Sequence, residues 1–192
     1  VPYWDYLGWP DPFAYKVFEN MQRAYCTKLV SQVYTPQFVL NGSSILMNGS
    51  QIQSFISDKL ALEGTTGISL HLLSDKNAPS LKIEYDVTGV PEGTDIAFAL
   101  LESDLVSQVT AGENRGKTLR HDNVVRFMKA VSLGDTPATT SIVVPSGINR
   151  ENLRIAAFAK DRSSLQILAG TTGIDLAAIS SVDPLPEQTT GI

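Results

Sequence analysis

The sequence predicts an α/β part at the N-terminus followed by an all-β part that forms an antiparallel sandwich. Before residue 63, apolar residues recur at helical spacing on either side of two short extended segments. From residue 67 onward, apolar and polar residues alternate in short runs that are separated by turn residues. Most of the aromatic residues precede residue 40, so the two parts also differ in composition.

The first helix is predicted to begin at Pro12, with Asp11 as its N-cap. Apolar residues then recur every three or four positions and would form one buried face, made of Ala14, Phe18, Met21, Tyr25 and Leu29. Two strands should follow, Tyr34 to Leu40 and Ile45 to Met47, joined by a turn at Asn41-Gly42.

A second helix is predicted after this hairpin, with Ser50 as its N-cap. Its inward face would consist of Ile52, Phe55, Ile56 and Leu60. The α/β part therefore occupies residues 1–63, and the boundary lies in the segment EGTTG at residues 63–67.

Alternating residues predict the strands of the sandwich, which we place at residues 67–176. The candidate strands are Ile68 to Leu72, Leu81 to Val87, Ile96 to Leu101, Val106 to Thr110, Val124 to Ala130, Ser141 to Val144 and Arg154 to Ala159. Residues 177–192 include the segment DPLPEQTTGI and are expected to form a loosely ordered tail.

The composition argues against several classes of function. The 192 residues are 43% hydrophobic and carry a net charge of −5, which disfavours nucleic acid as a partner. No apolar run is long enough to predict a membrane span, and no targeting signal is visible at the start. With one cysteine, Cys26, and two distant histidines, the chain should hold no internal disulfide, no structural zinc and no cofactor.

A string from Ala111 to Thr118 fits a loosened form of the phosphate-binding loop pattern. Such a loop needs a helix directly after it, inside a parallel sheet, so that backbone N–H groups converge on the phosphates. Here the neighbouring segments on both sides are predicted sandwich strands. We therefore interpret Gly112 to Asn114 as a turn, with Lys117, Arg120 and Arg126 in solvent, and expect no nucleotide.

Four stretches of the sequence resemble a known bacterial family. They are YWDYLGWPDPFA at residues 3–14, QRAY at 22–25, YTPQFVLNG at 34–42 and GENRGKTLRHDNVVR at 112–126. Together they are similar to the thioredoxin-like proteins of domain of unknown function 1223. The resemblance implies a thioredoxin-like domain, incomplete at its N-terminus, followed by a β-sandwich domain, and a periplasmic or secreted location.

The chain departs from this family at its start. Family members begin with a strand and a Cys-x-x-Cys segment, and this sequence contains neither, since it starts at what resembles the end of the second family strand. Two explanations are open: the sequence lacks upstream residues, or the protein has lost the redox half of the fold. The first is favoured because the remaining strands would leave a central sheet with unpaired backbone groups.

The resemblance also implies a groove for a peptide or thiol partner. Thr35-Pro36 resembles the cis-proline dipeptide that faces the reactive thiolate in thioredoxin-like folds, against the alternative of a trans proline on an edge strand. Trp4, Asp5 and Trp9 place a carboxylate among aromatic rings at the predicted end of a strand. Aromatic packing beneath a long loop is the competing interpretation of these three residues.

Two further candidates are assigned structural roles. Cys26 lies inside the first predicted helix and is interpreted as a small buried apolar residue rather than a reactive thiol. His121-Asp122 is interpreted as a surface pair, because adjacent residues on a strand point to opposite faces.

No residue is therefore assigned a catalytic role. The sequence favours a protein whose complete form handles thiols or extended peptides, without a redox cysteine pair of its own. The alternative is a non-catalytic binding module whose sandwich recruits a partner.

Overall fold

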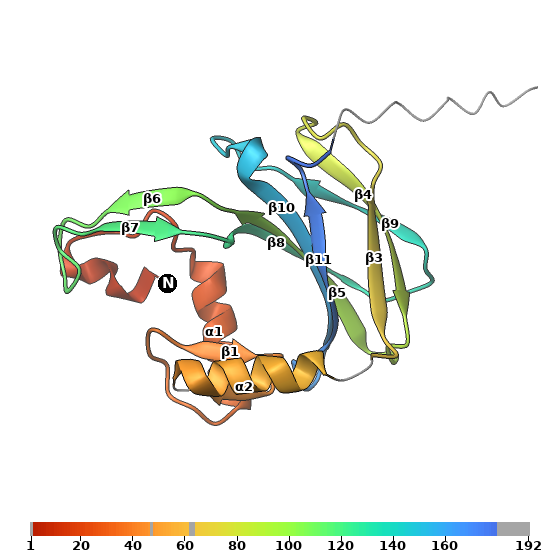
Figure 1. The fold of residues 1–192 in the computed structure, drawn as a ribbon, viewed down its shortest axis with the longest axis horizontal. Coiled ribbons are helices and arrows are strands. Elements are labelled where there is room, and N and C mark those ends of the chain that lie inside the picture. The colour runs from red at the N-terminus through yellow and green to blue at the C-terminus, as the bar shows by residue number, and fades with distance from the viewer. Residues whose placement is uncertain (1, 47, 62–63, 180–192) are drawn as a thin grey trace, which may run out of the picture.

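The computed structural model describes residues 2–46, 48–61 and 64–179, and its fold combines a few helices with antiparallel sheets (Figure 1). In this part of the chain, every strand pairing is antiparallel. The α-helices precede residue 61, and the long strands follow residue 66. The predicted combination of α and β structure is thus confirmed at this coarse level.

The N-terminal part contains five elements in the order 3-10 helix, helix, hairpin, helix. They are η1 (Pro2–Leu7), α1 (Lys16–Lys28), β1 (Phe38–Leu40), β2 (Ser44–Leu46) and α2 (Gly49–Leu60). The hairpin turns where it was predicted, and Asn41 and Gly42 both take positive φ angles, of 48° and 65°. Asparagine and glycine are the residues that tolerate this conformation best.

Both helices begin at other residues than predicted. Helix α1 starts at Lys16, because the Asp11 carboxylate accepts a hydrogen bond from the Phe13 N–H and closes a local turn instead of capping the helix. Helix α2 is capped by Asn48, whose side chain accepts from the Gln51 N–H, while the Ser50 hydroxyl donates to that same Asn48 side chain.

The predicted inward face of α2 is wrong for its second half. Ile52 and Phe55 are half-buried, but Ile56 is 46% exposed and Leu60 is 80% exposed. The spacing of apolar residues identifies the apolar face of a helix. In α2, other described residues pack against only the first half of that face.

Helix α1 ends in a hydrogen-bonding pattern that favours glycine, but valine occupies the position. The Ser31 N–H donates to Cys26 O at 2.9 Å and the Val30 N–H to Thr27 O at 3.4 Å, the two bonds of a Schellman motif. Val30 takes a φ of 50° and is 95% exposed, so its branched side chain is strained and gains no burial.

Replacing this residue by glycine, Val30→Gly, is therefore expected to raise the free energy of unfolding by about 1 kcal/mol, as measured by urea denaturation. Ala24→Gly, at an exposed position within the same helix, should lower it by about the same amount. If both variants lose stability equally, backbone strain at Val30 is not the cause.

The β-rich part forms two main sheets. One has the order β11-β10-β5-β8 and the other β3-β4-β9. Their strands are β3 (Gly67–Leu72), β4 (Ser80–Thr88), β5 (Thr94–Glu102), β8 (Val124–Ser132), β9 (Ala138–Val143), β10 (Leu153–Asp161) and β11 (Ile167–Asp175). The short 3-10 helix η2 (Arg150–Asn152) leads into β10.

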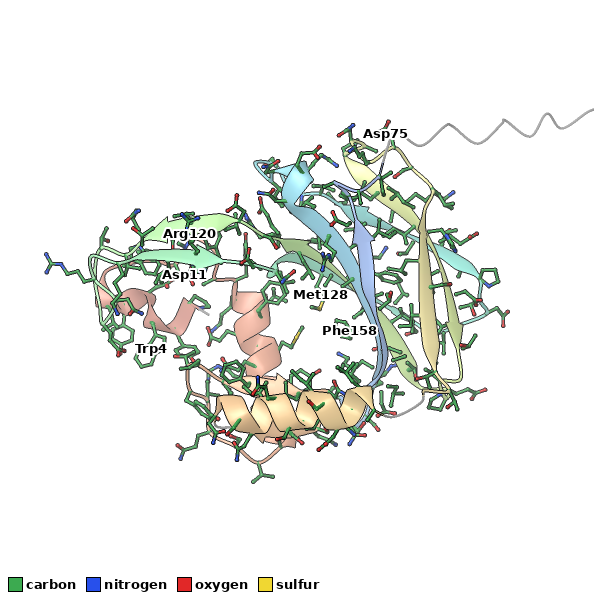
Figure 2. All side chains as sticks on the ribbon, viewed as in Figure 1. Trp4, Asp11, Asp75, Arg120, Met128 and Phe158 are labelled. Carbon is green, nitrogen blue, oxygen red and sulfur yellow. The ribbon has the colours of Figure 1, made fainter. Side chains whose placement is uncertain are left out.

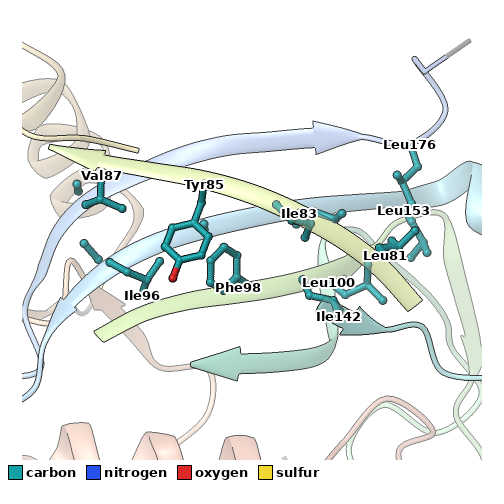
Figure 3. Packing of buried hydrophobic residues seen from close by; sticks show 14 residues of the cluster. Leu81, Ile83, Tyr85, Val87, Ile96, Phe98, Leu100, Ile142, Leu153 and Leu176 are labelled. Atoms are coloured by element: carbon teal, nitrogen blue, oxygen red, sulfur yellow. The ribbon is translucent and has the colours of Figure 1, made fainter. Parts of the chain in front are cut away.

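The two sheets share one hydrophobic core (Figure 3). Alternate residues of β4 and β5 point into it, and Phe98 lies at its centre with its ring centroid 5.0 Å from that of Tyr85. Fully buried members from the other strands include Ile142, Leu153 and Ile155. Burial of alternating apolar residues from both sheets is the main stabilising contribution in this part of the chain.

Sequence patterns identified most of these strands but missed two. Strand β11 was not predicted, and neither was β7 (Thr118–His121), which pairs with β6 (Leu105–Gln108). Within the predicted loose tail, residues 177–192, Ile179 packs against the core. The rest of that tail, residues 180–192, lies outside the described part, as do Met47 of the predicted strand and residues 62–63 at the predicted boundary.

Strands β6 and β7 form a two-stranded arm that continues β5 and β8 beyond the sheet (Figure 1). At its base, Asp104 and Asn123 take positive φ angles of 56° and 54°. The Asp122 side chain accepts from the Asp104 N–H, and the Ser103 hydroxyl oxygen accepts from the Asn123 N–H. These bonds fix the direction in which the arm leaves the sheet, toward the N-terminal segment.

The N-terminal part is attached to the β-rich part through the connection between β10 and β11. The Ile167 N–H donates to Asn41 O at 2.9 Å, and the Tyr25 hydroxyl donates to Leu165 O at 3.2 Å. Burial raises the pKa of the Tyr25 phenol, which therefore stays protonated as a donor. A methyl group on Gly42 would lie 2.1 Å from Leu165 O, so the two backbones meet closely here.

Candidate functional site

The residues before α1 form a tightly turned, aromatic segment rather than the strand end that the sequence suggested. Pro2 to Leu7 are a 3-10 helix, which stops at Gly8, where φ is 95° and the N–H donates to Asp5 O. The Asp5 carboxylate then accepts a hydrogen bond from the Asp11 N–H at 3.3 Å. Asp5 thereby holds the segment folded back on itself.

Helix α1 supports this segment from one side. The Arg23 guanidinium lies over the ring of Tyr3, 5.9 Å from its centroid. Arg23 also pairs with the buried Glu19, whose carboxylate accepts from Lys16 as well. The hydrogen bond from Lys16, together with that from Arg23, holds the pKa of Glu19 below its usual value, so the carboxylate stays charged.

A direct bond joins the aromatic segment to the loop before β1. The Trp4 indole N–H donates to the Thr35 hydroxyl at 2.8 Å, across 31 residues of sequence. Trp4 also packs against Tyr3 and Tyr6, with ring centroids 5.5 and 6.0 Å apart. The peptide bond between Thr35 and Pro36 is cis.

The five predicted site residues line a single cleft of about 680 Å³. Its walls include Trp4, Asp5, Trp9, Thr35 and Pro36. The structure thus brings together residues that the sequence analysis had selected from two separate segments. Their part in binding stays a prediction.

The opposite wall of the cleft comes from the arm, which the sequence analysis did not include. Val109, Ala111, Gly112, Glu113, Asn114 and Leu119 all line it. The contact is close: an added Cβ on Gly112 would lie 3.6 Å from Leu7 Cδ1, and one on Gly8 would lie 3.6 Å from Ala111 Cβ. The signal that could have indicated this wall was the stretch at residues 112–126, which carried part of the family resemblance.

The loop of the arm is not a phosphate-binding loop. The Val109 N–H donates to Lys117 O and the Gly116 N–H to Val109 O, so these backbone N–H groups bond within the loop instead of pointing at a phosphate. The residues that follow, Thr118–His121, are strand β7 rather than a helix. The interpretation of this string as a turn between strands is confirmed.

Phe13 contacts two side chains of the β-rich part. The His121 ring meets it edge to face at 5.2 Å, and the Arg126 guanidinium lies 5.5 Å from its centroid. Arg126 is in turn paired with the buried Glu102. Arg126 is therefore a half-buried anchor, not the solvated side chain that the sequence suggested.

His121 does not pair with Asp122. Its Nε2 lies 2.8 Å from the Ser107 hydroxyl, while the Asp122 carboxylate accepts from the Asp104 N–H. Ser107 is only 5% exposed, and Phe13 packs against the His121 ring. Because the hydroxyl is covered and Asp122 is engaged elsewhere, this pair anchors the arm rather than forming a nucleophilic site.

Cys26 is buried, 3% exposed, as expected. Its Sγ lies 3.3 Å from Gln37 Oε1 and 3.5 Å from Gln32 O, and the residue does not line the cleft. Among the described residues, no group of three or more histidine, cysteine, aspartate or glutamate side chains is arranged to hold a metal ion.

Figure 2 shows Trp4 on the 3-10 helix η1, and Met128 and Phe158 projecting from the large sheet toward α1 and α2. The strand register supports this, since Met128 pairs with Ala99 and Phe158 with Ala97, out of phase with the core residue Phe98. The cleft lies between the arm and the aromatic segment, since residues of both line it.

Comparison with known proteins decides the family. The family described as "Protein of unknown function (DUF1223)" matches residues 1–160. The chain belongs to this family. The match covers the whole candidate cleft, from Trp4 to Leu119.

The other comparisons are negative. No curated protein and no solved structure matches the chain. In the described part of this DUF1223 protein, none of the helices combines the length and apolar character that crossing a membrane requires.

Proposed function

We propose that the cleft between the aromatic segment and the arm binds an extended peptide of a partner protein. The fold that we infer around it is a thioredoxin-like domain, residues 1–63, followed by a β-sandwich domain, residues 67–176. The observation that supports the proposal best is the exposure of large apolar side chains at one cleft. Trp4 is 46% exposed there, and Tyr6 and Leu7 beside it are exposed as well.

The composition of the walls is compatible with a peptide ligand. They come from three stretches distant in sequence, 4–11, 35–36 and 109–119, so a bound peptide would contact the aromatic segment, the loop before β1 and the arm. Exposed aromatic side chains beside backbone of loops and turns are characteristic of peptide-binding surfaces. Rings that are already held in place, such as the Trp4 indole on Thr35, lose little freedom on binding.

Thiol exchange is a separate question from binding. The only cysteine of the printed sequence, Cys26, is buried away from the cleft. Redox chemistry at this cleft would therefore require cysteines from elsewhere. The coding sequence upstream of Val1 tests this: a Cys-x-x-Cys segment there supports thiol handling, and a start codon without a cysteine pair supports a non-catalytic binding module.

Tryptophan fluorescence offers a direct test of peptide binding. Both tryptophans of the chain, Trp4 and Trp9, line the cleft, so selective tryptophan excitation reports on this site alone. A pool of unstructured peptides with randomised central residues should contain members that shift the emission in a saturable way. For such a peptide, Trp4→Ala should weaken binding about 30-fold, as expected for loss of an aromatic anchor. Calorimetry provides the affinity of this variant.

Phe38→Ala provides the matched control. Phe38 is 43% exposed, close to the value for Trp4, but lies on β1 and does not line the cleft. It should leave the affinity unchanged. Equal losses in the two variants, or a complete absence of binding peptides in the pool, would contradict the proposal.

The location of the protein is part of the same proposal. We infer a periplasmic or secreted protein from the resemblance of its sequence to exported thioredoxin-like proteins. Fractionation of cells that express the full gene, with the chain detected by antibody, tests this directly. Recovery in the cytoplasmic fraction alone would contradict it.

A further inference from the structure

We propose that the cleft selects peptides through a lysine or arginine side chain, whose cationic group lies on the indole rings and pairs with carboxylates of the walls. This inference rests on the proposed function and names the chemistry of its ligand. Three observations support it: the charges that line the cleft, the hydrogen bonds that each carboxylate makes, and the cation–π contacts of neighbouring aromatic rings.

The lining charges are all of one sign. Asp5, Asp11 and Glu113 line the cleft, and its lining includes no lysine or arginine. Acidic residues thus face it from both walls, since Asp5 and Asp11 belong to the aromatic segment and Glu113 to the arm. A cationic group between the walls would be attracted by both of them.

Two of these carboxylates keep capacity for a ligand. Within the described residues, no hydrogen bond or ion pair engages the Glu113 side chain, and Asp5 uses only Oδ1, as acceptor for the Asp11 N–H. Asp11 is committed to the Phe13 N–H. The carboxylates of Asp5 and Glu113 are therefore the pair that a bound cation would meet.

The basic side chains of helix α1 and of the arm do not line the cleft. Arg23 and Lys16 are paired with Glu19, and Lys117 donates to the Asn114 amide oxygen at 3.0 Å. Arg115 is on the loop of the arm but is not part of the lining. The cleft therefore presents net negative charge to a ligand.

The same segment already binds guanidinium groups on its aromatic rings. Arg23 lies over Tyr3 at 5.9 Å and Arg126 over Phe13 at 5.5 Å. Trp4 and Trp9 lie between these two rings in sequence and face the cleft, and indole is the strongest aromatic partner for a cation. Within the described residues, no cationic side chain stacks on either indole.

The experiment compares peptides that differ only in the charge of one side chain. Binding peptides from the fluorescence assay are synthesised with arginine or its neutral isostere citrulline, and with lysine or acetyl-lysine, at one central position. The cationic form should bind at least about 10-fold more tightly, and the difference should shrink as salt is added. Glu113→Gln should reduce this preference several-fold.

Glu92→Gln is the control, because Glu92 is exposed in the turn between β4 and β5 and does not line the cleft. It should leave the preference intact. Equal affinity for charged and neutral peptides would overturn the inference while peptide binding itself stands. A pool in which no peptide shifts the fluorescence would instead overturn the proposed function, and this inference with it.

Discussion

Replacing Glu102 by alanine is expected to lower the free energy of unfolding by about 3–5 kcal/mol, measured by urea denaturation. The Glu102 side chain is 3% exposed and accepts from two groups, the Arg126 guanidinium and the Asn149 N–H. Removing the carboxylate leaves a largely buried guanidinium without its counter-charge and a backbone N–H without its acceptor. Loss of either partner of a buried pair costs more than the pair itself contributes.

Arg154→Ala provides the comparison, since it removes an ion pair from a neighbouring strand. Arg154 and Asp175 are 46% and 47% exposed and lie 3.8 Å apart, so solvent screens their attraction. This variant should lose no more than about 1 kcal/mol. A loss below about 1 kcal/mol for Glu102→Ala as well would show that Arg126 finds other partners or water in its place.

The consequences of losing Glu102 should reach the cleft. Glu102 pairs with Arg126, Arg126 stacks on Phe13, and Phe13 belongs to the aromatic segment that carries Trp4. The contact between Phe13 and His121 also ties that segment to the arm. A buried charge pair thus connects the core of the β-rich part with both walls of the candidate site.

The long strands were predictable because each buries one face. In β4 and β10, buried and more exposed residues alternate, and this alternation is visible in the sequence. Strand β7 carries only Leu119 and His121 on its inward face, and neither Thr118 nor Arg120 suggests a core. Strand β11 is interrupted by glycines, which weaken the pattern that identifies a strand.

Local signals located the hairpin but not the starts of the helices. Asn41-Gly42 turns as predicted because its backbone preference is intrinsic to those residues. Asp11 and Ser50 are good capping residues whose side chains are used in other local bonds, and sequence alone does not distinguish these uses. Capping by Asn48 follows the same chemistry two residues earlier.

The candidate site was predictable only in part. Trp4, Asp5 and Trp9 were selected for their unusual composition, and Thr35-Pro36 for its resemblance to a known dipeptide. The arm was missed because its contribution depends on how β6 and β7 leave the sheet, a property of backbone angles at Asp104 and Asn123. Contacts between segments so far apart in sequence leave no local pattern.

Gly173→Ala is expected to cost about 2–4 kcal/mol of folding free energy. Gly173 takes a φ of 85°, which strains any residue with a Cβ, and an added Cβ would lie 1.4 Å from the carbonyl oxygen of Ile155. The register of β11 against β10 shifts between Ile155 and Ala157, so the backbones approach each other at a bulge. Relief of the contact requires β11 to move away from the strand on which it pairs.

Gly170, on the same strand, provides the control. It tests whether β11 rejects a side chain only at Gly173 or at any position. An added Cβ on Gly170 would lie 3.8 Å from Ala157 O, an ordinary contact. Because glycine weakens a strand interior, Gly170→Ala should be neutral or stabilise by up to about 1 kcal/mol in thermal and urea denaturation. Equal losses of stability at the two positions would mean that β11 tolerates no side chain along its length and that the contact with the Ile155 carbonyl is not the cause. If Gly173→Ala loses stability and Gly170→Ala gains it, the restriction lies at the bulge between β11 and β10. The other edge of β10 pairs with β5, whose last residue is Glu102 at the base of the arm.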